Sequence, residues 1–166
     1  MRYQKFKASK TRGLYVLDSA TMSEGDILTM ARQLSRDRLA KGRFLVAPER
    51  TKDYLQNMMQ DYEHEVFAVV LLNAIHRIIG FHELFRGTVN ASTVYTREVV
   101  KLALANNAVA AIFAHNHPSG VSTPSLADIQ TTQHLKTALA LVDVRVLDHI
   151  VVGHDGCASL AEMGKL

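Results

Sequence analysis

The sequence lacks several features that would each indicate a particular class of protein. Its single cysteine, Cys157, excludes an internal disulfide and a cysteine-rich zinc site, and it favours a reducing compartment. No apolar run reaches the roughly 18 residues that a membrane-spanning helix needs. The first residues also lack the apolar segment of a secretory signal. We therefore expect a cytoplasmic protein with no membrane partner.

Other absences narrow the function further. The glycine-rich phosphate-binding loops of the Rossmann and Walker types are missing, and no internal repeat is visible. The chain has 166 residues, of which 48% are hydrophobic and 21% are charged, so it can form an ordinary globular core. Its net charge of +3 is too small to indicate nucleic-acid binding by itself.

Residues 1–45 are predicted to form an arm and a helix that pack on the rest of the chain. Cations alternate with aromatic residues in the arm, which is compatible with a contact to phosphates. A solvated arm with some strand character is the simpler interpretation. The cations are Lys5, Lys7, Lys10 and Arg12.

Two helices are expected in the first 62 residues. Thr21 and Glu24 have the spacing of a capping box, and apolar residues at helical spacing follow them. This pattern predicts a helix from about Ser23 to Leu39. A second helix is expected to begin with Thr51 as its cap and to continue to about Tyr62.

From Glu65 onwards, strand patterns alternate with helix patterns. Residues 66–72 form a continuous apolar run, which is typical of a strand that is buried on both faces. The following segments predict strands at 75–85, 108–114 and 144–152, and helices at 95–107 and 125–141. Residues 46–166 are therefore predicted to form an α/β domain with a mixed sheet.

Two histidines and an aspartate have the pattern of a metal site. His115 and His117 follow a predicted buried strand, and side chains two residues apart in an extended segment point to the same side. Asp128 lies in the first turn of the next predicted helix, after a loop that holds two of the three prolines. Two imidazoles and a carboxylate, with a fourth position left to water, are the ligand set of a catalytic zinc site. The sequence therefore predicts one Zn²⁺ on these three residues.

Hydrolysis at such a site also needs a base for the water and a donor for the developing oxyanion. Ser125 is placed to be that donor, although it is also a good cap for the following helix. Glu65, at the start of the first strand of the domain, is the leading candidate for the base, with Glu63 and Glu83 as alternatives. His149 is either a group that supports a ligand or, in the simpler interpretation, a hydrogen-bonded core histidine.

These residues resemble the JAMM motif of the JAB/MPN metalloprotease superfamily. The motif is formed by His115-Asn116-His117-Pro118, Ser125 and Asp128, and a wider similarity to RadC-type JAB domains extends from Glu65-x-Phe67 to the C-terminus. The resemblance implies the cytidine-deaminase-like, three-layer α/β/α fold with a mixed central sheet. It also implies zinc on His115, His117 and Asp128, assistance from Ser125, and Glu65 as the general acid and base.

The resemblance implies a zinc-dependent hydrolase that attacks a peptide or isopeptide carbonyl, with residues 46–166 as the JAB/MPN domain. The physiological substrate and the oligomeric state stay open. The alternative is a DNA-repair-associated, RadC-like protein that binds nucleic acid. Longer RadC-type proteins carry a helix-hairpin-helix region, and no glycine-rich hairpin of that kind is visible in residues 1–60. An inactive scaffold is disfavoured, because all three metal ligands are present.

Overall fold

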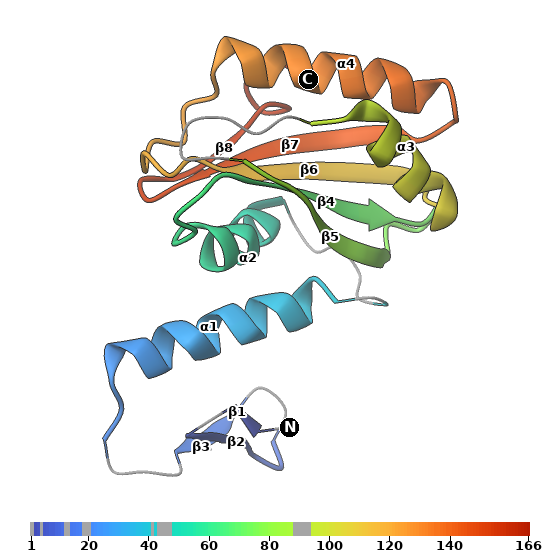
Figure 1. The fold of residues 1–166 in the computed structure, drawn as a ribbon. Helices are drawn as coiled ribbons and strands as arrows, with labels where there is room; N and C mark the ends of the chain where they lie inside the picture. Colours follow the sequence, from blue (N-terminus) through green and yellow to red (C-terminus); the bar gives the residue numbers. More distant parts are fainter. Residues whose placement is uncertain are drawn as a thin grey trace.

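A five-stranded mixed sheet lies at the centre of the molecule (Figure 1). Its strands are β4 (Val66–Leu72), β5 (Ile78–Arg86), β6 (Ala110–Asn116), β7 (Arg145–Gly153) and β8 (Gly156–Ser159), in the order β5-β4-β6-β7-β8. β6 and β7 are parallel, and the other neighbours are antiparallel. The computed structural model describes residues 2–3, 5–11, 14–17, 21–40, 42, 48–87 and 94–166.

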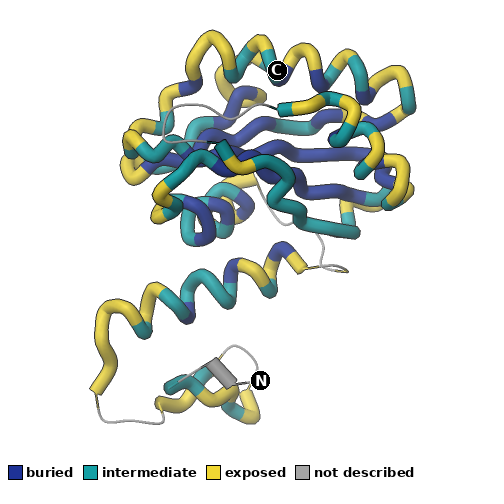
Figure 2. Tube along the Cα trace, viewed as in Figure 1, coloured by how far each residue is buried: buried dark blue, intermediate teal, exposed yellow. Residues whose placement is uncertain are grey.

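The two central strands β4 and β6 are buried along their whole length (Figure 2). Their apolar sequences allow this, because a strand in the middle of a covered sheet has no face exposed to water. The predicted antiparallel hairpin of β4 and β5 is confirmed. In its turn, the side-chain oxygen of Asn73 accepts hydrogen bonds from the backbone N–H groups of Ile75 and Arg77.

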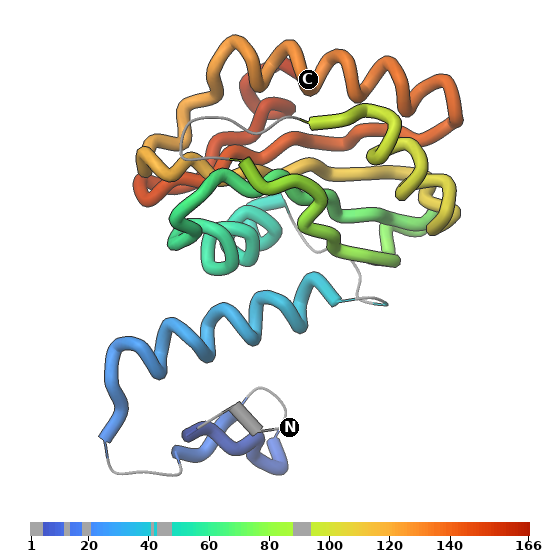
Figure 3. The backbone as a smooth tube through the Cα atoms, viewed as in Figure 1, coloured from blue at the N-terminus to red at the C-terminus, as the bar shows by residue number. Residues whose placement is uncertain are grey.

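Helices cover both faces of the sheet (Figures 1 and 3). α2 (Pro48–Met59) packs on the face that carries Val66, Ala68 and Val70. α3 (Thr96–Ala105) and α4 (Leu126–Ala140) contribute to the core on the opposite face. The alternation of side chains along β4 supplies both cores from one strand. The expected three-layer α/β/α arrangement with a mixed sheet is confirmed.

The N-terminal part of the chain forms a small antiparallel sheet and a helix. β1 (Arg2–Tyr3), β2 (Phe6–Ala8) and β3 (Tyr15–Leu17) pair in sequence order, so the strand character expected of the arm is present. α1 (Glu24–Arg38) follows them and packs against α2. No helix in the described residues is long and apolar enough to cross a membrane.

The first helix begins where predicted, but its predicted capping pair and the predicted start of the second helix are wrong. Ser23 caps α1 and forms a capping box with Asp26, whose carboxylate is also bound by Lys5 at 2.8 Å. The predicted capping pair was Thr21 and Glu24. Ser23 and Asp26 have the same spacing two residues further along the chain and form the cap in its place. α2 begins at Pro48, and Thr51 is buried within the helix. Proline fits a first helical position because the N–H that it lacks would have no partner in the helix.

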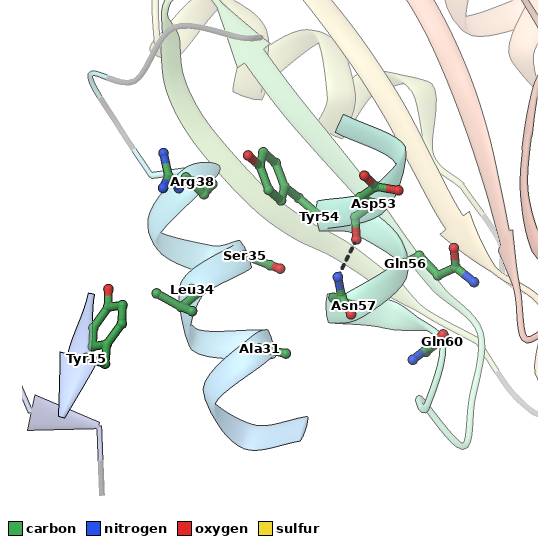
Figure 4. Close-up of a pocket in the computed structure, with 10 residues that line it drawn as sticks. All are labelled: Tyr15, Ala31, Leu34, Ser35, Arg38, Asp53, Tyr54, Gln56, Asn57 and Gln60. Atoms are coloured by element: carbon green, nitrogen blue, oxygen red, sulfur yellow. Dashed lines mark hydrogen bonds between the residues drawn. The ribbon is translucent and has the colours of Figure 1, made fainter. Parts of the chain in front are cut away.

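Two further features complete the fold. β8 was not predicted, because its four residues are too few to show an alternating pattern, although the turn before it was expected. A cleft of about 630 Å³ opens between α1 and α2, with Tyr15 of β3 among its lining residues (Figure 4). The cleft contains none of the predicted site residues.

Candidate metal centre

The structure brings His115, His117 and Asp128 together at the end of β6. Their ligand atoms lie within 4.8 Å of one another. The two Nε2 atoms are 3.0 Å apart, and each lies 3.4 Å from a different carboxylate oxygen of Asp128. Tetrahedral ligands about 2.0–2.1 Å from a zinc ion would be about 3.3 Å apart. The spacing of these side chains therefore fits one metal ion.

His117 is oriented by the loop that follows it. Its Nδ1 donates a hydrogen bond to the backbone carbonyl of Val121 at 2.8 Å. Because a carbonyl can only accept, the hydrogen is on Nδ1 and the Nε2 lone pair faces the cluster. Gly120, with φ of 85°, turns this loop, and its carbonyl accepts the backbone N–H of His154 at 2.8 Å. The loop is thereby fixed to the turn between β7 and β8.

Asp128 is both a helix-capping residue and a member of the cluster. Ser125 Oγ accepts its backbone N–H at 3.1 Å, and its carboxylate accepts the backbone N–H of Ser125 at 2.7 Å. Burial raises the pKa of Asp128, but the imidazoles of His115 and His117 outweigh that effect and bring the pKa well below its usual range. The capping interpretation and the metal interpretation are therefore compatible, because the cap aims the ionised carboxylate at the histidines.

Glu65 lies beside the cluster, at the start of β4. Burial raises the pKa of its carboxyl, which also interacts electrostatically with His115, Asp128 and His117. The alternatives are placed differently. Glu83 accepts a hydrogen bond from the hydroxyl of Tyr62 at 2.7 Å, and Glu63 is exposed. Glu65 is therefore the candidate base whose surroundings include all three predicted ligands.

Asn116 is a site residue that the sequence reasoning missed. Its Oδ1 accepts the backbone N–H of Val66 at 2.8 Å, and its Nδ2 donates to the carbonyls of His64 at 3.1 Å and Tyr62 at 3.3 Å. This buried side chain therefore binds the segment that carries Glu65 to the strand that carries the histidines. A polar residue between two predicted ligands, at the end of a buried strand, was the available signal.

His149 is more than a core histidine. Its ring is buried and packs edge-on against the rings of Phe67 and Phe113. The ring centroids are 5.5 and 5.8 Å away, respectively. Its Nε2 lies 2.8 Å from Nδ1 of His115, so it contacts a predicted metal ligand from behind. Burial, followed by the nearby His115, holds the pKa of His149 well below its usual value. The interpretation that it only fills the core is therefore incomplete.

The α/β/α fold, with His-x-His at the end of a central strand and aspartate in the first turn of the next helix, defines the JAB/MPN class of domains. The RadC-like JAB domain matches residues 45–165, and the chain belongs to that family.

Relatives support this assignment. A UPF0758 protein of Methylibium petroleiphilum is 56% identical over 140 residues, which are 84% of this chain and 63% of that protein. A UPF0758 protein of Vibrio cholerae is 55% identical over 143 residues, which are 86% of this chain and 90% of that protein. One from Marinobacter nauticus is 53% identical over 139 residues, with 62% of that protein covered. The chain thus spans slightly less than two thirds of some relatives and most of another.

The cations near the N-terminus are the residues through which a nucleic-acid contact would be made. Lys5 of the arm forms an ion pair with Asp26, and Arg32, which lies in α1 and outside the arm, is paired with Asp61. Arg12 lies outside the described residues. Neither of the two paired cations is therefore free to face a phosphate without first breaking its ion pair.

Proposed function

We propose that this chain is a zinc-dependent hydrolase of the JAMM type that cleaves a peptide or isopeptide bond. Zn²⁺ on His115, His117 and Asp128 would polarise the carbonyl and lower the pKa of a water from about 16 towards 7. The observation that carries the proposal is the convergence of the three ligand atoms within 4.8 Å, next to a carboxylate that is not one of them. Residues 46–166 would form the catalytic domain, with residues 1–45 packed against it.

Glu65 would move the proton in this reaction. A base must be ionised to accept a proton from water, and it then returns that proton to the leaving amine. The pKa of Glu65 is raised by burial, which makes the carboxylate a better proton acceptor than an exposed glutamate. Its electrostatic interactions with all three predicted ligands support this role.

Ser125 would stabilise the negative charge that develops on the carbonyl oxygen. Its hydroxyl oxygen accepts the N–H of Asp128, so the hydroxyl hydrogen can be donated outwards. The side chain is exposed at the start of α4 and is held by the helix cap. A donor that is already held in place needs little reorganisation during the reaction.

The test combines metal analysis with a substrate screen. Protein purified without chelators is expected to contain about one zinc per chain. A library of peptides with α-linked and lysine ε-linked amide bonds, read by mass spectrometry, would show which bond is cut. Glu65→Gln is expected to keep the zinc and to lose about 10²–10⁴-fold in kcat. Glu63→Gln, a change of the same kind on the exposed neighbour, should stay at wild-type activity.

Two results would overturn parts of the proposal. Full activity of Glu65→Gln would show that another group is the base. Failure of the wild-type protein to bind zinc, even after reconstitution, would remove the metal site and with it the hydrolase.

A further inference from the structure

A chain of three short contacts runs behind the metal centre, from one predicted ligand to another. His115 Nδ1 lies 2.8 Å from His149 Nε2, and His149 Nδ1 lies 2.5 Å from Thr132 Oγ1. Thr132 Oγ1 in turn lies 2.6 Å from the backbone carbonyl oxygen of Asp128. His115, His149 and Thr132 are at most 1% exposed. Bulk solvent therefore does not reach these side chains.

The carbonyl at the end of the chain fixes the direction of every hydrogen bond in it. A carbonyl oxygen can only accept, so the single hydroxyl hydrogen of Thr132 points to Asp128. The oxygen of Thr132 must then accept from His149, which places the ring hydrogen of His149 on Nδ1. A neutral imidazole has one N–H, so Nε2 of His149 accepts from Nδ1 of His115. This order leaves the Nε2 of His115 as a bare lone pair.

We propose that His149 and Thr132 are positioning residues, which hold His115 in the Nδ1–H tautomer and connect the histidine ligand to the helix that carries Asp128. The reverse direction would put the hydrogen of His115 on Nε2, where no metal could bind. The metal-binding part of this inference rests on the proposed function. The tautomer is a property of the metal-free protein and does not.

We call the hydrogen-bonded series from His115 through His149 and Thr132 to Asp128 the relay. The rings around His149 explain why it can keep its geometry. Phe67 and Phe113 contact His149 edge-on, so rotation of the ring is restricted by aromatic packing. In such apolar surroundings, each hydrogen bond is stronger than in water and an unpaired group is costly. The partners of ligating histidines commonly contribute 10–100-fold to metal affinity. Breaking this relay should therefore weaken zinc binding by a factor of that size.

The test uses Thr132→Val, which keeps the shape of the side chain and removes the hydroxyl. Thr137→Val is the matched control, because Thr137 lies on the same helix and its hydroxyl donates to the carbonyl of Gln133 at 2.9 Å. Long-range ¹H–¹⁵N spectra of the metal-free protein at pH 8 report the tautomer of His115. Competition with a chromogenic chelator reports the affinity for Zn²⁺.

The wild-type protein and Thr137→Val are expected to show His115 with its hydrogen on Nδ1. Thr132→Val should show a mixture of tautomers and bind zinc about 10–100-fold more weakly. Thr132→Ser, which restores the hydroxyl, should return both readings to near wild type. In His149→Gln, the side-chain amide can accept from His115 and donate to Thr132, as the histidine does. This variant should therefore bind zinc more tightly than His149→Met.

Two outcomes would overturn the inference. One is a wild-type His115 that carries its hydrogen on Nε2, and the other is a zinc affinity of Thr132→Val equal to that of Thr137→Val. A wild-type protein that binds no zinc would instead overturn the proposed hydrolase. The spectra of the metal-free protein would still decide the relay in that case.

Discussion

The two histidines of the metal centre are supported in different ways, although they stand only two residues apart. His115 belongs to an inner wall, which we define by His115, His149 and Thr132 and which is buried. His117 belongs to a rim, which we define by His117, Val121 and Ser125 and which is at least partly open to solvent. In the wall, side chains orient the ligand. In the rim, a backbone carbonyl does so.

The two groups also differ in how far apart in the sequence their contacting residues lie. The wall combines residues from β6, α4 and β7, so it exists only after the sheet and the helix have packed. In the rim, the side chains are oriented by contacts between residues three or four apart, namely His117 with Val121 and Ser125 with Asp128, although the backbone of the loop is also bound to the turn between β7 and β8. We therefore expect changes in the wall to affect stability and metal binding together, and changes in the rim to affect metal binding with little loss of stability.

The largest expected difference is between His115→Ala and His117→Ala. Both variants should lose stoichiometric zinc. His115→Ala should also destabilise the metal-free protein by about 2–4 kcal/mol, because it leaves a cavity and an unpaired His149 nitrogen. His117→Ala should cost less than about 1 kcal/mol, since its side chain is partly exposed. Urea unfolding in the presence of a chelator measures this, and equal costs would contradict the division into wall and rim.

The next prediction concerns Asn116, which joins β6 to the segment that carries Glu65. Asn116→Ala leaves the buried N–H of Val66 without its partner, at a cost of about 1–3 kcal/mol. The freed segment should lower kcat about tenfold or more while zinc is retained, because a small displacement of a catalytic group is costly.

The control for Asn116 is Asn73→Ala, at the other end of β4. Asn73 also accepts two backbone N–H groups through its side-chain oxygen, but in the exposed turn of the hairpin. It should lose some stability and keep its kcat. Comparison of kcat and the urea midpoint in both variants separates positioning of Glu65 from general loosening. An unchanged kcat in Asn116→Ala would show that Glu65 does not depend on this support.

The last prediction, whose effect on the protein at neutral pH is the smallest, concerns the pH dependence of the rim. The hydrogen bond to the carboxylate of Asp128 raises the pKa of His117 above its ordinary 6.5, although burial acts to lower it. Below that raised pKa a proton occupies Nε2, so zinc affinity should fall up to about tenfold per pH unit as the pH drops. Asp128, with its pKa well below the usual range, stays ionised over the same interval.

The contribution of His117 to the stability of the metal-free protein should change in the opposite direction, and the difference between the wild type and His117→Ala isolates it from the contribution of His149, whose lowered pKa acts with the opposite sign. A folded-state pKa above the unfolded value contributes stability that is present below the unfolded pKa of about 6.5 and is lost as pH rises through the folded pKa. Chelator competition and urea unfolding between pH 5.5 and 8.5 would measure both slopes. An affinity that does not change over this range would contradict the assignment of His117 as a ligand.

Much of the rim and most of the elements were predictable, because their signals are local. The apolar run of β4 and the spacing of Ser125 and Asp128 each act within a few residues. The loop that returns Asp128 to the histidines is short and holds two prolines, so the convergence of ligands could also be expected. The role of Asn116 could not be predicted as readily, because its three backbone partners lie about 50 residues earlier.

The sequence by itself determined the residue types of the metal centre and the strand, loop and helix that carry them. Only the tertiary structure decided what stands behind His115. A register shift between β6 and β7, at Ala111 and Ile112, pairs Phe113 with His149. Without that shift the neighbouring Asp148 would occupy this position, because a slip of one residue sends every later side chain to the other face of the sheet. The register depends on the packing of both faces, which no local pattern in the sequence contains.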